Sequence, residues 1–121
     1  MAYTRTQVRK LLNTGEIEIF ESSRAEAVKE LNAPRLIVKV KRARMLRDKY
    51  RDLLKRQRLA TRVRTGSKAG NSSGANQRTR EKAEVFAEIL ERFEKRLALV
   101  EATAARAARK ESSERPRLTL T

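Results

Sequence analysis

The chain contains no cysteine and no histidine among its 121 residues. Without cysteine, neither a disulfide framework nor a thiolate metal site can form. The two absences together remove the commonest general base, the commonest metal ligand and the most nucleophilic side chain. We therefore expect a protein that is not an enzyme and that needs no metal and no cofactor.

Aromatic residues, glycine and proline are also scarce. Only 4% of the residues are aromatic, tryptophan is absent, and there are 4 glycines and 2 prolines. A core must then be built mainly from aliphatic side chains, and single-strand binding by stacked aromatic rings is disfavoured. The abundant residues Ala, Leu, Glu, Arg and Lys are strong helix formers, so the composition predicts an all-α protein.

Long hydrophobic runs are missing as well. No stretch approaches the roughly 18 apolar residues that a membrane span needs, and the first residues lack the apolar segment of a signal peptide. We expect a soluble, cytoplasmic protein with no integral membrane segment.

Residues 1–32 predict two short helices. Thr4 and Gln7 fit a capping box that opens a helix over residues 5–13, and Gly15 suits the position that ends it. A second helix is expected over residues 16–31, although two consecutive serines near its middle weaken this prediction. This part holds five basic and five acidic residues, so it is electrically neutral.

Two long helices are predicted to follow. Asn32 reads as the N-cap of a helix over residues 33–64, with Pro34 in its first turn. A second long helix is expected to begin between residues 76 and 79 and to end near residue 109. The seam positions step alternately by three and four from Ala43 onward in the first helix and throughout the second, which is typical of a coiled-coil seam. The expected seam positions are Leu36, Val40, Ala43, Leu46, Tyr50, Leu53, Gln57 and Ala60 in the first helix, and Ala83, Phe86, Leu90, Phe93, Leu97, Val100 and Ala104 in the second.

Between the long helices lies a stretch rich in Gly, Ser and Asn, which predicts a flexible basic loop over residues 65–78. The expected fold is therefore a long antiparallel, coiled-coil-like helical hairpin over residues 33–109, in a single domain. The two short helices would cover its open end or one side, and residues 110–121 would form a disordered tail. The heptad register suggests an ion pair between Arg47 and Glu94 across the seam.

The positive charge is concentrated in one part of the chain. The formal net charge is +15, and residues 33–80 contain 16 basic residues against only two acidic ones, Asp48 and Asp52. Residues 81–109, by contrast, hold six acids and six bases. The heptad register places cations at six of the seven outward positions between residues 41 and 62 of the first long helix, and the loop extends this basic stripe. The candidate nucleic-acid-binding residues are Lys41, Arg44, Arg51, Lys55, Arg58, Arg62, Arg64, Lys68, Arg78 and Arg80.

Motifs that would point to other chemistry are absent. No glycine-rich run has the spacing of a phosphate-binding loop followed by Lys and Ser or Thr. Asp48 and Asp52 lie four residues apart and could suggest a Mg²⁺ pair, but we expect them to pair with neighbouring Arg and Lys on the same helix. A basic segment followed by heptads is also found in basic leucine zippers, but there the helix is continuous, without a glycine loop.

The function expected from these patterns is binding of nucleic-acid phosphate through the basic helix and loop. Structured RNA, with a ribosome-associated role among the options, is slightly preferred over DNA. The main alternative is a regulatory protein that docks its basic hairpin on an acidic protein partner. Binding to an anionic membrane surface is a third reading, disfavoured by the lack of Trp and Phe on the apolar face. The heptad seam also leaves open a homodimer.

Overall fold

The computed structural model describes residues 3–65 and 74–114, and within these residues every regular element is a helix. The all-α prediction is confirmed. In chain order the helices are α1 (Arg5–Leu11), α2 (Thr14–Ser22), α3 (Ala25–Val28), α4 (Ala33–Thr65) and α5 (Gly74–Glu114).

The starts of α1, α2 and α4 are fixed by side-chain caps. Thr4 and Gln7 form the predicted capping box, and Asn13 forms a second one with Glu16. The Asn32 side chain accepts a hydrogen bond from the backbone N–H of Arg35 at 3.0 Å, which confirms it as the cap of α4. Each cap satisfies backbone donors that the first turn of a helix leaves unpaired.

The N-terminal part differs from the prediction in two respects. Gly15 does not end a helix, because it lies in the first turn of α2, whose cap is Asn13. The helix expected over residues 16–31 is broken after Ser22 into α2 and the short α3. The Ser23 hydroxyl donates to the carbonyl oxygen of Phe20 at 2.6 Å, and the backbone of Arg24 is extended. Serine side chains compete in this way for helix carbonyls, which explains the break.

The cap of α4 gives a first testable prediction. Replacing Asn32 with Ala should lower the free energy of unfolding by about 1 kcal/mol, because one donor of the first turn loses its partner. Asn32→Asp should retain the stability, since a carboxylate accepts the same hydrogen bond. Urea denaturation of both variants would measure this difference, and an Asn32→Ala protein as stable as the wild type would refute the role of the cap.

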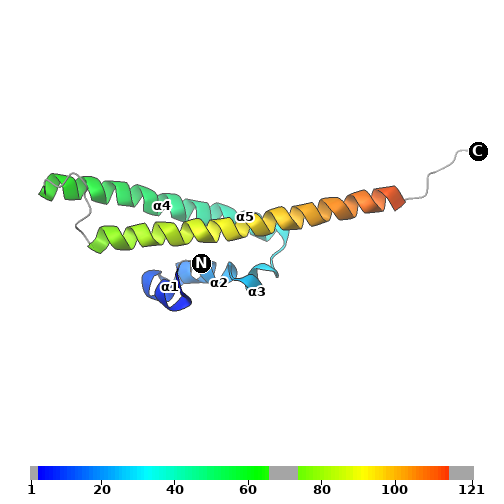
Figure 1. Cartoon of the computed structure of the whole chain (residues 1–121), viewed down its shortest axis with the longest axis horizontal. Helices are drawn as coiled ribbons and strands as arrows, with labels where there is room; N and C mark the ends of the chain where they lie inside the picture. Colours follow the sequence, from blue (N-terminus) through cyan, green and yellow to red (C-terminus); the bar gives the residue numbers. More distant parts are fainter. Residues whose placement is uncertain (1–2, 66–73, 115–121) are drawn as a thin grey trace, which may run out of the picture.

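Helices α4 and α5 form a long antiparallel hairpin (Figure 1). Leu36, Val40, Ala43 and Tyr50 of α4 are buried, and so are the four seam residues of α5 from Ala83 to Phe93. The seam is therefore filled within one chain over this length. Towards its C-terminus α5 projects past the start of α4, and every residue from 101 to 113 is exposed.

Three details of the predicted hairpin are wrong. The loop is shorter than residues 65–78, because α4 ends at Thr65 and α5 begins at Gly74; residues 66–73 lie outside the described part of the chain. Residues 110–114 are helical and not part of a disordered tail, while residues 115–121 are not described. Near the loop Ala60 is exposed and Thr61 is buried in its place. A straight helix has 3.6 residues per turn and drifts out of a heptad phase of 3.5, which accounts for this shift.

The N-terminal helices pack along one side of the hairpin (Figure 1). Here α5 buries Val85 and Ile89, which lie outside the heptad seam, in the same core as Val8, Ile19 and Phe20 of α1 and α2. Helix α5 is thus buried on more than the α4 side. This explains how a small hairpin with few aromatic residues obtains a core.

A buried polar cluster joins three helices. The Tyr50 hydroxyl of α4 donates to the Glu16 carboxylate of α2, and the ammonium group of Lys82 on α5 lies 3.8 Å from the same carboxylate. Glu16 also accepts a hydrogen bond from the backbone N–H of Asn13 at 3.0 Å. Burial and the hydrogen bond to Glu16 raise the pKa of Tyr50. The buried carboxylate therefore has partners on every side and ties α2 to the hairpin.

Candidate nucleic-acid interface

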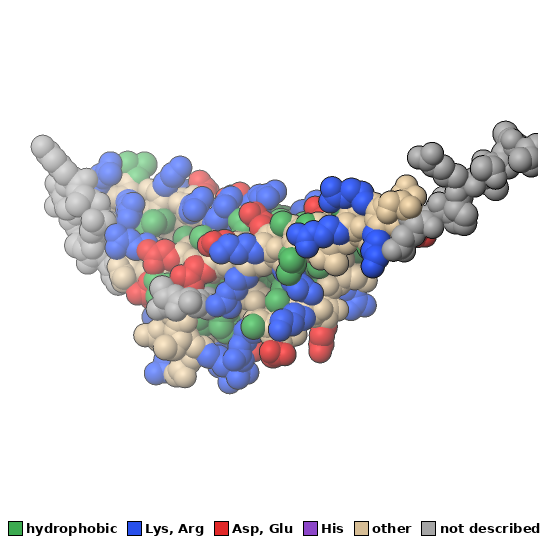
Figure 2. Space-filling view, turned by 45° about the vertical axis from the view of Figure 1, so that its right-hand side comes forward, with side chains coloured by type: hydrophobic (Ala, Val, Ile, Leu, Met, Phe, Trp, Pro, Cys, Tyr) green, Lys and Arg blue, Asp and Glu red, His purple; other side chains and the backbone are tan. Residues whose placement is uncertain are grey.

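The outward face of α4 carries the predicted basic stripe. Helix α4 is long and uninterrupted, so residues at the outward positions stay on one side over many turns. Figure 2 shows Lys and Arg side chains along the upper edge of the molecule, over α4 and the projecting end of α5. The predicted site residues of α4 that are exposed are Lys41, Arg44, Arg51, Lys55, Arg62 and Arg64.

The two acidic residues of α4 are neutralised by cations of the same helix. Asp48 pairs with Arg47 at 3.0 Å, and Asp52 pairs with Arg56 at 3.0 Å. These pairs confirm the prediction that both aspartates serve their helix neighbours. The predicted Arg47–Glu94 pair is wrong, because Arg44 contacts Glu94 at 3.3 Å while Arg47 turns to Asp48.

Several cations of the stripe are left without an acidic partner. Within residues 3–65 and 74–114, no ion pair engages Lys41, Arg51, Lys55 or Arg62. Cations held close together along one helix face repel each other, so a polyanion that screens them stabilises the arrangement. A salt bridge at the surface of a protein contributes at most about 1 kcal/mol, so even the Arg44 pair can exchange for a phosphate.

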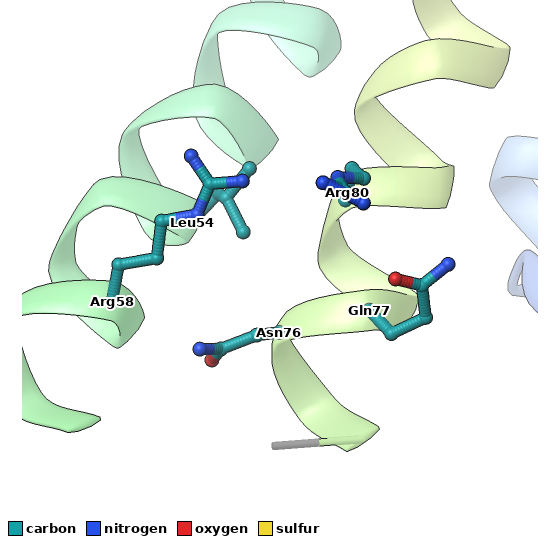
Figure 3. A pocket seen from close by; sticks show the side chains of 5 residues that line it. All are labelled: Leu54, Arg58, Asn76, Gln77 and Arg80. Atoms are coloured by element: carbon teal, nitrogen blue, oxygen red, sulfur yellow. The ribbon is translucent and has the colours of Figure 1, made fainter. Parts of the chain in front are cut away.

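Arg58 and Arg80 stand apart from the stripe. Arg58 was expected on the exposed face, but it is half-buried and lines a cavity of about 190 Å³ between α4 and α5 (Figure 3). Arg78 and Arg80 are exposed on the first turns of α5 and not in the loop. Lys68 lies outside the described residues. The loop end of the hairpin thus brings together Arg58 and Arg80 from opposite helices.

The same helix also exposes large apolar side chains, which the heptad prediction missed. Val38, Met45 and Leu59 are 60–71% exposed, and Val63 near the end of α4 is 81% exposed. Val38, Met45 and Leu59 share one heptad position, because they lie seven and fourteen residues apart. The sequence therefore contains a second periodic set of apolar residues, apart from the seam. The exposed surface of α4 is accordingly basic with apolar spots.

Two carboxylates on or beside the N-terminal helices, Glu21 and Glu84, have local partners. Glu21 of α2 lies within 3.4 Å of Arg5, Arg9 and Arg24. Burial opposes its ionisation, but the hydrogen bonds from Arg5 and Arg24 outweigh burial and lower the pKa of the Glu21 carboxyl. Glu84 of α5 accepts a hydrogen bond from Tyr3, whose pKa is raised by burial and by this bond. The α1–α3 side of the molecule is thus balanced in charge.

The described ranges contain no candidate metal site and no candidate membrane-spanning helix. They contain no group of three or more acidic side chains placed to hold a metal ion. None of the helices described is long and apolar enough to cross a membrane. Comparison with protein-family models, with curated proteins and with solved structures finds no match to this chain.

Proposed function

We propose that this protein binds the phosphate backbone of nucleic acid through the exposed cations of α4 and through Arg64, Arg78 and Arg80 at the loop end of the hairpin. The observation that carries the proposal is the row of exposed α4 cations without acidic partners, on a chain whose net excess of positive charge lies almost wholly in residues 33–80. Lys68, which lies outside the described residues, is proposed to extend the same surface. The proposed role is non-enzymatic and cytoplasmic.

The length of the basic stripe suits a regular polyanion. From Lys41 to Arg62 the helix rises about 32 Å at 1.5 Å per residue. A rigid rod of this length can follow several successive phosphates of a groove or junction, and a coiled-coil-like hairpin would keep it straight. Contacts to phosphate position a protein but carry no base sequence. We therefore infer recognition of backbone and shape, with structured RNA slightly preferred over DNA.

Nuclease-controlled purification tests the proposal and identifies the nucleic acid. The protein is purified at low salt, and the bound material is sized before and after treatment with RNase or DNase. Bound nucleic acid that only one of the two nucleases removes would support the proposal and would identify the bound material as RNA or DNA. Protein that leaves the column without nucleic acid would overturn it.

Salt dependence provides the quantitative prediction. Binding to a defined RNA or DNA duplex should weaken steeply with salt, with a slope of about −4 or steeper in a plot of log affinity against log salt concentration, because each neutralised phosphate contributes ~0.9. Fluorescence anisotropy at a series of salt concentrations measures this slope. A slope near zero would contradict backbone binding, since no counterions would then be released.

The exposed apolar side chains of α4 favour one alternative. Cations surround the exposed apolar side chains of Val38, Met45 and Leu59. A surface of this composition suits docking on a protein that offers both acidic and apolar groups. Under this alternative, Met45→Ser would weaken the complex as strongly as loss of a cation. In nucleic-acid binding it would have little effect, because Met45 neutralises no phosphate.

A further inference from the structure

The cavity at the loop end of the hairpin is built from both long helices. Leu54 and Arg58 of α4 form one wall, and Asn76, Gln77 and Arg80 of α5 form the other. Figure 3 shows the side chains of Arg58 and Asn76 reaching into the gap between the helices, with Arg80 viewed end-on at the α5 edge of the gap. The volume of about 190 Å³ is several times the ~30 Å³ that one water molecule occupies in the liquid. The cavity has room for a group of several heavy atoms.

The charge on the cavity wall is unbalanced. Two of the five lining residues are arginines, and none is acidic. Guanidinium groups stay charged at any physiological pH, so the two cations repel each other across the cavity. An anion between them would turn this repulsion into two attractions.

A buried donor in the wall is also unused. The Nε atom of Arg58 is buried and has no hydrogen-bond partner among the described residues. A buried donor without a partner costs free energy, and most such groups in folded proteins are satisfied. Arg58 thus has a donor that no described protein group uses.

The start of α5 adds a favourable field. Helix α5 begins at Gly74, so Asn76 and Gln77 lie in its first turn. The N-terminus of a helix carries partial positive charge and unpaired N–H groups, which favour an anion. The Asn76 side chain is fixed by a hydrogen bond from its amide to the Thr61 hydroxyl at 3.3 Å, which joins the two walls.

We propose that this cavity is a discrete phosphate-binding site, in which Arg58 and Arg80 hold one phosphate group from opposite sides. The fork of N–H donors on arginine matches the oxygens of phosphate. The phosphate is either part of a nucleic-acid backbone or a free phosphate compound. The site deepens the proposed function, because it would fix one phosphate while the exposed stripe of α4 contacts the others.

Inorganic phosphate tests the site without nucleic acid. In NMR titrations of the full chain at constant ionic strength, the side-chain N–H signals of Arg58 and Arg80 should shift saturably with phosphate but not with chloride. Arg51 and Arg62, which are exposed on α4, provide the internal control. Shifts at Arg58 and Arg80 no larger than those at Arg51 and Arg62 would overturn the proposal.

Charge-conserving variants then identify the source of the phosphate. Arg58→Lys and Arg80→Lys keep the net charge but lose the fork of donors, so binding to RNA or DNA should weaken about tenfold if the pocket holds a backbone phosphate. Arg106→Lys, at an exposed position of α5 outside the proposed interface, is the matched control, and we expect a change of less than about twofold. Unchanged nucleic-acid binding by both pocket variants, with saturable phosphate shifts in the wild type, would assign the site to a free phosphate compound.

The two proposals fail separately in these experiments. A wild-type protein that binds inorganic phosphate in the pocket but binds no nucleic acid would refute the proposed function and retain the site. A wild-type protein that binds nucleic acid without saturable shifts at Arg58 and Arg80 would support the proposed function and refute the phosphate site. Arg80 is exposed, so its variant should fold normally; thermal unfolding checks this for both variants.

Discussion

Replacing Phe86 with Ala should lower the free energy of unfolding by about 3–5 kcal/mol, the range for loss of a buried aromatic ring. Phe86 is fully buried on the α4–α5 seam, and its ring stacks on Tyr50 with 5.7 Å between the ring centroids. Tyr50 in turn donates to Glu16 of α2. The cavity left by the substitution would therefore loosen the hairpin and the attachment of the N-terminal helices together.

Two control variants make this prediction specific. Phe86→Leu keeps most of the apolar volume and should cost clearly less than Phe86→Ala. Leu99→Ala removes a side chain that is 53% exposed and should change stability by less than about 1 kcal/mol. Urea denaturation followed by circular dichroism measures all three variants. Equal stabilities of Phe86→Ala and Leu99→Ala would contradict the described core.

Neutralising four cations of α4 should reduce nucleic-acid affinity on the order of a thousandfold at moderate salt, since each cation contributes one counterion-releasing contact. The variant carries Gln at Lys41, Arg51, Lys55 and Arg62, all exposed and without an acidic partner among the described residues. The salt slope should also fall by about 4. Fluorescence anisotropy with one duplex at several salt concentrations measures both changes.

A second variant with the same net charge separates location from total charge. It carries Gln at four exposed cations away from α4, namely Lys10, Lys29, Arg106 and Lys110. If α4 is the interface, this variant should bind within about tenfold of the wild type, because only the long-range attraction is reduced. Equal losses in both variants would show that the protein attracts polyanions by charge alone and has no defined binding face.

The sequence predicted the helices where local signals agree. Asn32 and Thr4 fix helix starts by hydrogen bonds to residues three positions away, so a short stretch of sequence is enough. The seam from Ala83 to Phe93 was likewise visible as a repeat. Val85 and Ile89 were not, because their burial depends on how the N-terminal helices pack on α5, which no periodicity in α5 reveals. The two serines at positions 22 and 23 indicated a weak point in the second helix, but the sequence did not show that the helix breaks there.

The candidate site, too, could be predicted from the sequence only where it depends on one helix. The exposed stripe follows from helical periodicity alone, and most of its predicted members are exposed. Arg58 was assigned to that stripe because a heptad wheel places it outward. Its true environment depends on Asn76 and Arg80, which lie on another helix and meet it only across the hairpin. A pocket between two helices cannot be read from the pattern of either one.

The uneven distribution of charge makes the molecule a strong electric dipole. The neutral helices α1–α3 lie along one side of the hairpin, while α4 carries most of the excess cations. In the field of a polyanion such a body experiences a torque before any contact forms. It would approach with α4 foremost and with α1–α3 turned outward, so that the balanced face remains free for a second macromolecule once the first is bound.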